Sequence, residues 1–513
     1  MNRRRFLSWT ANTLGALGLA SNGLAAQKSS PSAGVTPENA ADSRRRPNVL
    51  FIMSDQHKRT CMGVAGDPVA VTPHLDRLAQ QSVRFTSAYC NYPVCAPSRA
   101  SMLTGRYNHN LETWNNSVPY APRHKTIAHA FSRAGYFSGL IGKMHFVDAQ
   151  THGFEYELEF NDWFQWLGPK GKLYADEQGL RTPGGAGLPQ IDGLWKGEGN
   201  PWRYVTEPDG RLGPVAVGRP SRMEEPDHFE SFVARESIRF LEKYAQQDEP
   251  FFLVSSFLKP HEPFMPAARF AEMFQPEQMK LSPTWGKADL NNIPAQVRRS
   301  IETSPITPEL LKPEGARRRM AYYYGNLAQT DDAAGQILSA LERLGLDRNT
   351  IVVYTADHGE MLGDLGLWLK FQFYEGSCGV PLLIRMPGHA PSVCDQPVSL
   401  VSLYPTLAEL CGVQPAGPCD GKSFADLLVR PEANFQYGPV FAEYALGTRG
   451  AKYMIRDGDL KYTYWMHDRA ELYDLATDPV ELHNLAGMPE HASTVQRLQE
   501  KLFAWHKPGP DEG

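Results

Sequence analysis

The chain has 513 residues, of which 42% are hydrophobic and 21% charged, and its formal net charge is −5. This length allows a large buried core and two or three domains of ordinary size, and the negative charge argues against general nucleic-acid binding. A protein of this charge that acts on an anion must attract it with a local cluster of cations rather than with its overall field.

Residues 1–26 have the pattern of a twin-arginine export signal. Arg3-Arg4-Arg5 precede an apolar stretch, Trp9–Ala20, and the small residues Gly23–Ala26 suit a signal peptidase. The stretch is shorter than the ~20 residues that span a bilayer, so we predict cleavage and no stable membrane insertion. Because the segment holds three arginines and no acid, its removal leaves a net charge of −8. The expected location is periplasmic or extracellular, reached through the twin-arginine translocase.

The rest of the chain divides into three predicted segments. Residues 27–46 are rich in Ser, Pro and Ala without apolar periodicity, which is typical of a flexible linker. Residues 47–420 form the predicted main domain. Beyond it, two short alternating runs flank Asp457-Gly458, a hairpin-type turn signal. We therefore predict a smaller α+β subdomain over residues 421–513.

Four short apolar runs of the main domain are predicted to be buried strands, because none shows the polar alternation of a half-exposed strand. They are Asn48–Met53, Tyr136–Ile141, Phe251–Phe257 and Thr350–Thr355. Helix-like segments lie between them, namely Thr72–Ser82, Phe229–Tyr244 and Arg319–Leu344. This alternation predicts an α/β fold, a large mixed, mostly parallel sheet flanked by helices.

Polar side chains follow each predicted strand. The four groups are Asp55-Gln56-His57, Lys143-Met144-His145, Lys259-Pro260-His261 and Asp357-His358-Gly359. In open α/β sheets the functional site lies off the carboxyl ends of the strands. One such group is typical of a surface loop, but four in the same position relative to a strand indicate a site.

Cys95 begins the segment Cys95-Ala96-Pro97-Ser98-Arg99. Pro97 and Ser98 suit a helix start, so Cys95 is expected at or just before a helix N-terminus, where the dipole and free N–H groups favour an anion. A cysteine there is either an activated thiolate or a buried thiol. Seven cysteines in an oxidising compartment leave at least one without an intramolecular partner. Cys95 is the candidate, and both disulfides and free thiols stay open for the other six.

This segment resembles the Cys-x-Pro-Ser-Arg signature of type I sulfatases, in which a formylglycine-generating enzyme oxidises the cysteine to formylglycine and the hydrated aldehyde becomes the nucleophile. Other segments resemble the family's motifs in the family's order: Gly142–Phe146, Lys259–Phe264, Asp357–Gly363, Gly366–Lys370, Val380–Leu382, and Glu471–Leu475 with Asp478-Pro479. The resemblance covers roughly residues 47–486. It implies a sulfatase with an alkaline-phosphatase-like fold.

The resemblance also implies a set of site residues. Those assigned to a divalent cation are Asp55, Gln56, Asp357, His358 and the modified Cys95. Those assigned to orienting the formylglycine, binding sulfate and transferring protons are Arg99, Lys143, His145, His261 and Lys370. A sulfate monoester is negative and gathers charge on its bridging oxygen as the S–O bond breaks, so its hydrolysis needs a cation and fixed donors.

Proton transfer has its own candidates. The aldehyde hydrate has two hydroxyls, of which one attacks sulfur and the other loses its proton so that the adduct collapses to aldehyde and sulfate. His145 is the expected base for this collapse, and His261 or Lys370 the expected acid for the leaving group.

Two positions depart from many arylsulfatases, which have a second aspartate in place of Gln56 and an asparagine in place of His358. The pattern resembles choline sulfatases and phosphonate monoester hydrolases more closely. An imidazole ligand weakens the case for calcium alone, because hard cations prefer oxygen. Calcium is the first expectation, with manganese or zinc open. Two other functions also stay open: hydrolysis of phosphonate monoesters or phosphodiesters at the same site, and a non-catalytic binding protein.

The substrate is not determined by the sequence. Residues 151–225 hold four tryptophans among many Gly and Pro, which predicts a long loop region that either shapes a substrate pocket or packs on the surface. They are Trp163, Trp166, Trp195 and Trp202. Neither Asn115-Asn116 nor Glu360 decides between carbohydrate, aryl and choline sulfates.

Overall fold

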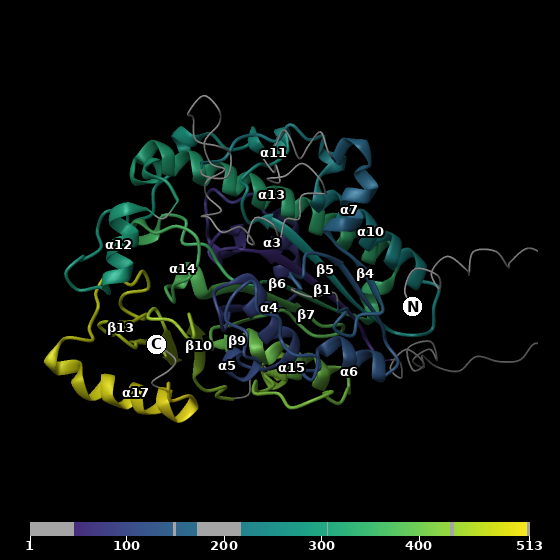
Figure 1. Cartoon of the computed structure of the whole chain (residues 1–513). Helices are drawn as coiled ribbons and strands as arrows, with labels where there is room; N and C mark the ends of the chain where they lie inside the picture. Colours follow the sequence, from purple (N-terminus) through teal and green to yellow (C-terminus); the bar gives the residue numbers. More distant parts are fainter. Residues whose placement is uncertain (1–45, 147–149, 172–216, 305, 431–434, 510–513) are drawn as a thin grey trace, which may run out of the picture.

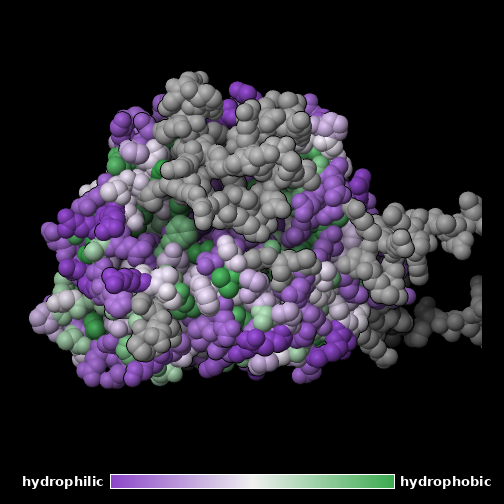
Figure 2. All heavy atoms as spheres, in the orientation of Figure 1, coloured by the Kyte–Doolittle hydropathy of each residue, from purple (hydrophilic) through white to green (hydrophobic). Residues whose placement is uncertain are grey.

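The computed structural model describes residues 46–146, 150–171, 217–304, 306–430 and 435–509 (Figure 1). The predicted signal peptide and all of the linker except Arg46 lie outside these residues. Within the described ranges, no helix combines the length and the apolar character that crossing a membrane requires. Figure 2 shows a mainly hydrophilic described surface on one face, with hydrophobic side chains scattered across it.

A nine-stranded sheet forms the centre of the molecule, in the order β4-β3-β5-β1-β6-β7-β2-β8, with β9 also paired to β2. The strands are β1 Asn48–Asp55, β2 Val83–Tyr89, β3 Phe137–Gly142, β4 Tyr156–Leu158, β5 Phe251–Pro260, β6 Thr350–Ala356, β7 Gly379–Arg385, β8 Ser392–Cys394 and β9 Val398–Ser399. Only β7 runs antiparallel to its neighbours, β6 and β2. The predicted mixed, mostly parallel sheet is confirmed.

Helices cover both faces of the sheet, which explains why its strands lack polar alternation. In β1, Val49, Phe51 and Met53 belong to one hydrophobic core. Leu50 and Ile52 belong to the other. The first core is closed mainly by α4 Cys95–Thr104, α6 Ile127–Arg133 and α15 Leu403–Leu410. The second is closed by α3 Pro73–Ala79, α7 Phe160–Leu167, α10 Phe229–Tyr244 and α13 Pro313–Arg343.

A second, antiparallel sheet lies near the C-terminus, in the order β10-β11-β12-β13 (Figure 1). Its strands are β10 Val440–Tyr444, β11 Lys452–Asp457, β12 Leu460–Trp465 and β13 Glu471–Asp474. The helix α17, Ala492–Trp505, packs against it. The tight turn between β11 and β12 contains Gly458 at φ 63°, a conformation that favours glycine. A domain boundary near residue 420 stays a prediction.

The described part of the predicted long loop region is not loop throughout. Residues 156–167 contain β4 and α7, and Trp163 on α7 is a core residue whose indole N–H donates to the carbonyl of Asp227. Trp166 is exposed, with the Arg235 guanidinium 3.9 Å from its ring centre. Trp163 therefore serves packing rather than a pocket, while Trp195 and Trp202 lie outside the described residues.

Candidate active site

The predicted site residues converge at the carboxyl edge of four neighbouring parallel strands. Asp55 ends β1, and Gln56 follows it with a positive φ of 67°. Lys143 and His145 follow β3, and His261 follows β5. Asp357 and His358 follow β6. The strand order β3-β5-β1-β6 brings all four groups side by side.

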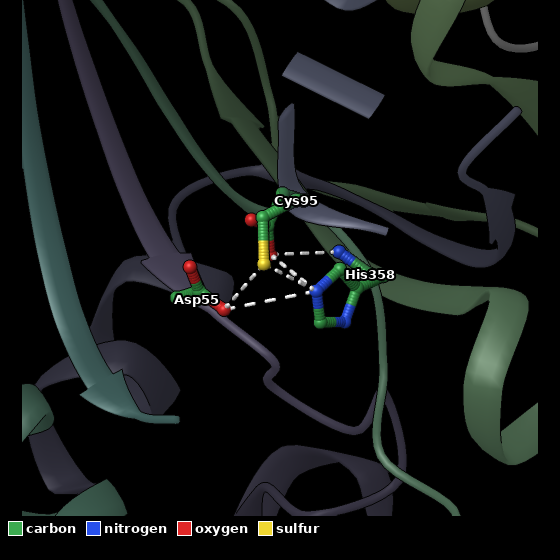
Figure 3. Close-up of side chains that lie close together, drawn as sticks. Asp55, Cys95 and His358 are labelled. Atoms are coloured by element: carbon green, nitrogen blue, oxygen red, sulfur yellow. Dashed lines mark hydrogen bonds and ion pairs between the residues drawn. The ribbon is translucent and has the colours of Figure 1, made fainter. Parts of the chain in front are cut away.

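Cys95 is the first residue of α4 and has no exposed surface. Its Sγ lies 3.6 Å from Oδ1 of Asp55 and 3.2 Å from Nε2 of His358 (Figure 3). The N–H of Ala96, one residue further along α4, donates to Oδ1 of Asn116 at 3.0 Å. The thiol therefore sits at a helix N-terminus, directed at the ends of β1 and β6. All seven cysteines are described, and all are free thiols.

Arg99 joins the two aspartates. Its Nε donates to Oδ2 of Asp357 at 2.7 Å, and its Nη2 donates to Oδ2 of Asp55 at 3.0 Å. The third nitrogen, Nη1, donates to Ser256 Oγ at 3.1 Å and to the Lys143 carbonyl. Because the guanidinium is buried, this planar fork fixes Oδ2 of both carboxylates. Oδ1 of Asp357 accepts from the backbone N–H groups of Gln56 and His358.

The atoms at this centre fit a divalent cation. One ligand atom from each of Asp55, Cys95, Asp357 and His358 lies within 4.8 Å of the others. His358 Nδ1 lies 2.9 Å from the Gly359 carbonyl, which can only accept, so Nδ1 carries the proton and Nε2 presents its lone pair. Burial lowers the pKa of His358, which favours the neutral ring that binds metals. Oδ1 of Asp55 and Oδ1 of Asp357 each lie 3.7 Å from Nε2 of His358, and together these three atoms form a candidate site for a positive ion.

The charge of Asp55 is stabilised by its neighbours. Burial alone would raise the pKa of this carboxyl, but Lys143, His261 and Arg99 hold it well below its usual range. Lys143 makes the closest of these contacts, with Nζ 2.5 Å from Oδ2. Asp55 is therefore an anion at neutral pH despite having no exposed surface.

Gln56 lies at the same edge but has partners of its own. Its Oε1 accepts from Lys370 Nζ at 2.5 Å, and its Nε2 donates to Glu262 and Glu360. Its role as a cation ligand stays a prediction, because its oxygen meets Lys370 in this structure.

His261 and Lys370 form a hydrogen-bonded pair in which the proton can be located. His261 Nδ1 lies 2.6 Å from the Glu262 carbonyl, so this nitrogen is the donor. Its Nε2 then accepts from Lys370 Nζ, 2.9 Å away. Although burial lowers the pKa of Lys370, its interactions with Cys95 and Glu262, followed by Asp55 and Asp357, raise the pKa overall. Lys370 is therefore a fixed positive charge.

His145 lines the same small cavity as Arg99. Its backbone is left-handed, at φ 65°, and burial followed by Lys143 and Arg99 lowers the pKa of its ring well below the usual range. The ring borders a small, mainly apolar cavity beside α4, lined also by Ala96, Arg99, Tyr120, Phe146 and His152. His145 is therefore a neutral imidazole near the start of α4.

Several residues of this site were not predicted. Ser256 bonds Arg99, and Asn116 bonds the start of α4. Glu262 and Glu360 hold Gln56, and Arg319 on α13 is buried beside them. Glu262 and Glu360 have a sequence signal, since each lies within two residues of a predicted site residue. Arg319 has none, because it reaches the site from the middle of a long helix.

Comparison with known proteins gives the family. The Sulfatase family profile matches residues 47–413, and the profile of the N-sulphoglucosamine sulphohydrolase C-terminal region matches residues 363–507. The choline-sulfatase of Rhizobium meliloti (strain 1021) is 32% identical over 451 residues, covering 86% of this chain and 83% of the relative. The arylsulfatase of Clostridium perfringens (strain 13 / Type A) is 29% identical over 485 residues, covering 91% and 96%.

Among solved structures, the phosphonate monoester hydrolase of Agrobacterium radiobacter superposes with a TM-score of 0.75 at 26% identity, covering 90% of this chain and 95% of that one. The fold, the sheet-edge site and these matches together show that the chain belongs to the sulfatase family, within the alkaline phosphatase superfamily. It is a sulfuric ester hydrolase, which sets aside the non-catalytic alternative.

Proposed function

We propose that this protein hydrolyses sulfate monoesters to alcohol and inorganic sulfate, using a formylglycine made from Cys95 and one divalent cation. The observation that carries the proposal is the position of the Cys95 sulfur. It lies at the N-terminus of α4, within 4.8 Å of ligand atoms of two carboxylates and one imidazole.

Asp55, Asp357, His358 and residue 95 would hold the cation, with Gln56 as a fifth ligand. When bound, the cation supplies positive charge that stabilises the sulfate oxygens and lowers the pKa of a coordinated hydroxyl. Calcium is the first candidate because the carboxylates are hard ligands, while the His358 imidazole keeps manganese and zinc as alternatives.

A formylglycine-generating enzyme would replace the Cys95 sulfur and two hydrogens with one oxygen. The hydrated aldehyde supplies a hydroxyl that attacks sulfur and a second hydroxyl that allows release of sulfate. Asp55 already accepts from Arg99 and Lys143, so these cations keep the carboxylates oriented around residue 95.

The remaining side chains divide into sulfate binding and proton transfer. Lys143 and Lys370 are the proposed fixed charges that bind sulfate oxygens. His261 Nε2 accepts from Lys370 Nζ in this structure. We assign Lys370 to binding and His261 to the leaving-group acid, a role in which His261 must first take up a proton at Nε2. His145, held neutral by its surroundings, is the proposed base.

Mass analysis of the peptide that contains residue 95 tests the nucleophile directly. The expected mass is below the encoded one, by the exchange of sulfur and two hydrogens for oxygen. The Cys95→Ala variant should fold and release no sulfate from an aryl sulfate. An unmodified thiol in fully active protein, or an alanine variant that keeps its turnover, would refute the mechanism.

The choline-sulfatase relative makes choline sulfate the first ester to test, followed by aryl sulfates and a panel of sulfated sugars. The structural similarity to a phosphonate monoester hydrolase supports a second candidate activity on phosphonate monoesters at the same site. Rates of sulfate and phosphonate ester cleavage at equal concentration separate the two, since the proposed main activity must be the faster.

We also propose export, on the basis of the twin-arginine pattern in residues 1–26. The mature chain is expected in the periplasm or outside the cell, without Arg3–Arg5. Cell fractionation with N-terminal sequencing tests this, and a chain found only in the cytosol with these arginines intact would contradict it.

A further inference from the structure

We propose that Glu262 and Glu360 are positioning residues that require an amide at position 56 and direct its oxygen toward the site. This inference rests on the proposed function, in which Gln56 is a cation ligand. It concerns how the chain presents that ligand and why the ligand is neutral.

The orientation of the Gln56 amide follows from its partners. Nε2 lies 2.8 Å from Oε2 of Glu262 and 2.5 Å from Oε2 of Glu360. An amide nitrogen has two hydrogens and can satisfy both carboxylates, whereas a flipped amide would place its oxygen against two other oxygens. The only favourable orientation therefore leaves Oε1 on the opposite side, where it meets Lys370.

Glu360 is itself held in place. Its Oε1 accepts from the backbone N–H of Leu362 at 3.0 Å and of Leu369 at 2.6 Å, and the residue has no exposed surface. Leu369 immediately precedes Lys370. Oε2 of Glu360 therefore fixes the amide nitrogen of Gln56, while Oε1 of Glu360 fixes the backbone just before Lys370. The side chains of Gln56 and Lys370 are thus held in contact with each other.

Charge balance explains why residue 56 is an amide. Lys370, the fully buried Arg319 and the His261 ring face Glu262, and Arg319 and Lys58 face Glu360. With a neutral Gln56, these groups share two carboxylates. A glutamate at position 56 would add a third carboxylate in direct contact with the first two, in a region without exposed surface, where unpaired charge is costly.

A double-mutant cycle on the full chain tests the proposal. Gln56→Glu places a carboxylate against Glu360, and adding Glu360→Gln exchanges amide and carboxylate across the same contact. Two readouts are independent of turnover: the thermal unfolding midpoint of the metal-stripped protein, and Ca²⁺ binding to it by calorimetry. Gln496→Glu is the matched control, because Gln496 Nε2 donates to Glu500 at 2.9 Å on the exposed face of α17.

We expect Gln56→Glu to lower the midpoint and to weaken Ca²⁺ binding on the order of 10- to 100-fold, the usual effect of disturbing the partners of metal ligands. Glu360→Gln in that background should recover part of both losses, because Glu262 still faces the carboxylate at position 56, and Gln496→Glu should change neither readout. If the changes in midpoint and in Ca²⁺ binding caused by the two substitutions are additive, the proposal is overturned, because additivity is the behaviour of independent sites.

Two further outcomes are informative: a variant that does not fold, and an unsubstituted protein that does not act on sulfate esters. If Gln56→Glu alone fails to fold, recovery of folding by the second substitution supports the proposal, and failure of both overturns it. If residue 95 is unmodified and no sulfate is released, the proposed function fails. The unfolding cycle still decides whether position 56 requires an amide.

Discussion

Cys95 Sγ lies 3.2 Å from Nε2 of His358, although 263 residues separate the two in the chain. The contact exists because α4 begins at the sheet edge where β6 ends. Arg99, one helical turn after Cys95, bonds Asp357 beside His358, so the same helix supplies both the sulfur and the clamp on the carboxylates. The site therefore depends on the packing of α4 as much as on any single ligand.

Arg99→Lys should abolish most turnover and destabilise the fold. A lysine keeps the charge but lacks the fork that bonds Asp55 and Asp357 together, so one buried carboxylate loses its partner, at about 3–5 kcal/mol. Chemical unfolding and sulfate release measure the two effects. Arg298→Lys, in the exposed pair with Glu302, is the control and should change the unfolding free energy by less than about 1 kcal/mol. Equal stability of the two variants would contradict the assigned role.

His261→Gln should slow esters with poor leaving groups more than esters with good ones. A general acid contributes on the order of 10²–10⁴-fold when the leaving oxygen needs a proton, and a nitrophenolate hardly needs one. The measurement is kcat/KM across aryl sulfates of graded phenol pKa. Lys370→Met, which removes a binding charge, should instead reduce all of them by a similar factor. If His261→Gln lowers kcat/KM by the same factor for all of these esters, His261 is not the leaving-group acid.

Removal of the cation should lower the thermal unfolding midpoint and stop turnover. A ligand that binds only the folded chain stabilises it by about 2.7 kcal/mol at a hundredfold excess over Kd. Chelation followed by addition of Ca²⁺, Mn²⁺ or Zn²⁺ ranks the ions by recovered midpoint. The Asp357→Ala variant should be insensitive to the chelator. If chelation does not change the unfolding midpoint of the unsubstituted protein, the proposed cation site is contradicted.

Lys461→Met should strongly destabilise the protein. Lys461 on β12 is buried and bonds Glu375 at 2.8 Å, Glu481 at 2.5 Å and the Phe373 carbonyl, which ties the C-terminal sheet to the segment after Lys370. Its loss leaves two buried carboxylates without this cation, at about 3–5 kcal/mol. Lys501→Met, which breaks the half-exposed pair with Asp457, should cost less than about 1 kcal/mol. Similar losses in both variants would refute the buried network.

Asp331 gives a pH dependence of stability with a defined sign. This buried carboxyl on α13 accepts the backbone N–H groups of His74 and Leu75, and burial, followed by nearby Asp76 and Asp332, raises its pKa from 3.8 to about 7. The folded state therefore binds the proton more tightly than the unfolded chain. This contribution is full below about pH 4 and is lost as the pH rises to 7, by about 4 kcal/mol at most.

The measurement is the difference in unfolding free energy between the unsubstituted chain and Asp331→Asn at pH 5 and pH 8. Because asparagine does not titrate, the unfolding free energy of the unsubstituted chain should fall relative to that of Asp331→Asn between pH 5 and pH 8. A difference independent of pH would contradict the raised pKa.

Much of the fold could be predicted because the four central strands are buried on both faces and read as continuous apolar runs. The predicted run Phe251–Phe257 became β5, and Phe229–Tyr244 became α10 with the same bounds. The helix predicted at Arg319 begins earlier, at Pro313, where proline suits the first turn. The antiparallel direction of β7 was not predicted, because strand direction depends on the connection and not on apolar pattern.

The location of the candidate site could be predicted for a similar reason, because residues that follow parallel strands share one edge of the sheet. What could not be predicted are contacts between side chains far apart in the sequence. Glu360 bonds Gln56 across 304 positions, and Arg319 approaches both glutamates from α13. Such partners are ordinary charged residues until the fold brings them together.

Cys95 has no exposed surface, and this has a consequence for how the protein matures. An enzyme that converts the thiol needs access to it, so conversion must come before α4 packs against the sheet. On the proposed twin-arginine route, which carries folded chains, both events would fall in the cytoplasm. The burial of one sulfur atom would then set the order of biogenesis: oxidation first, folding second, translocation last.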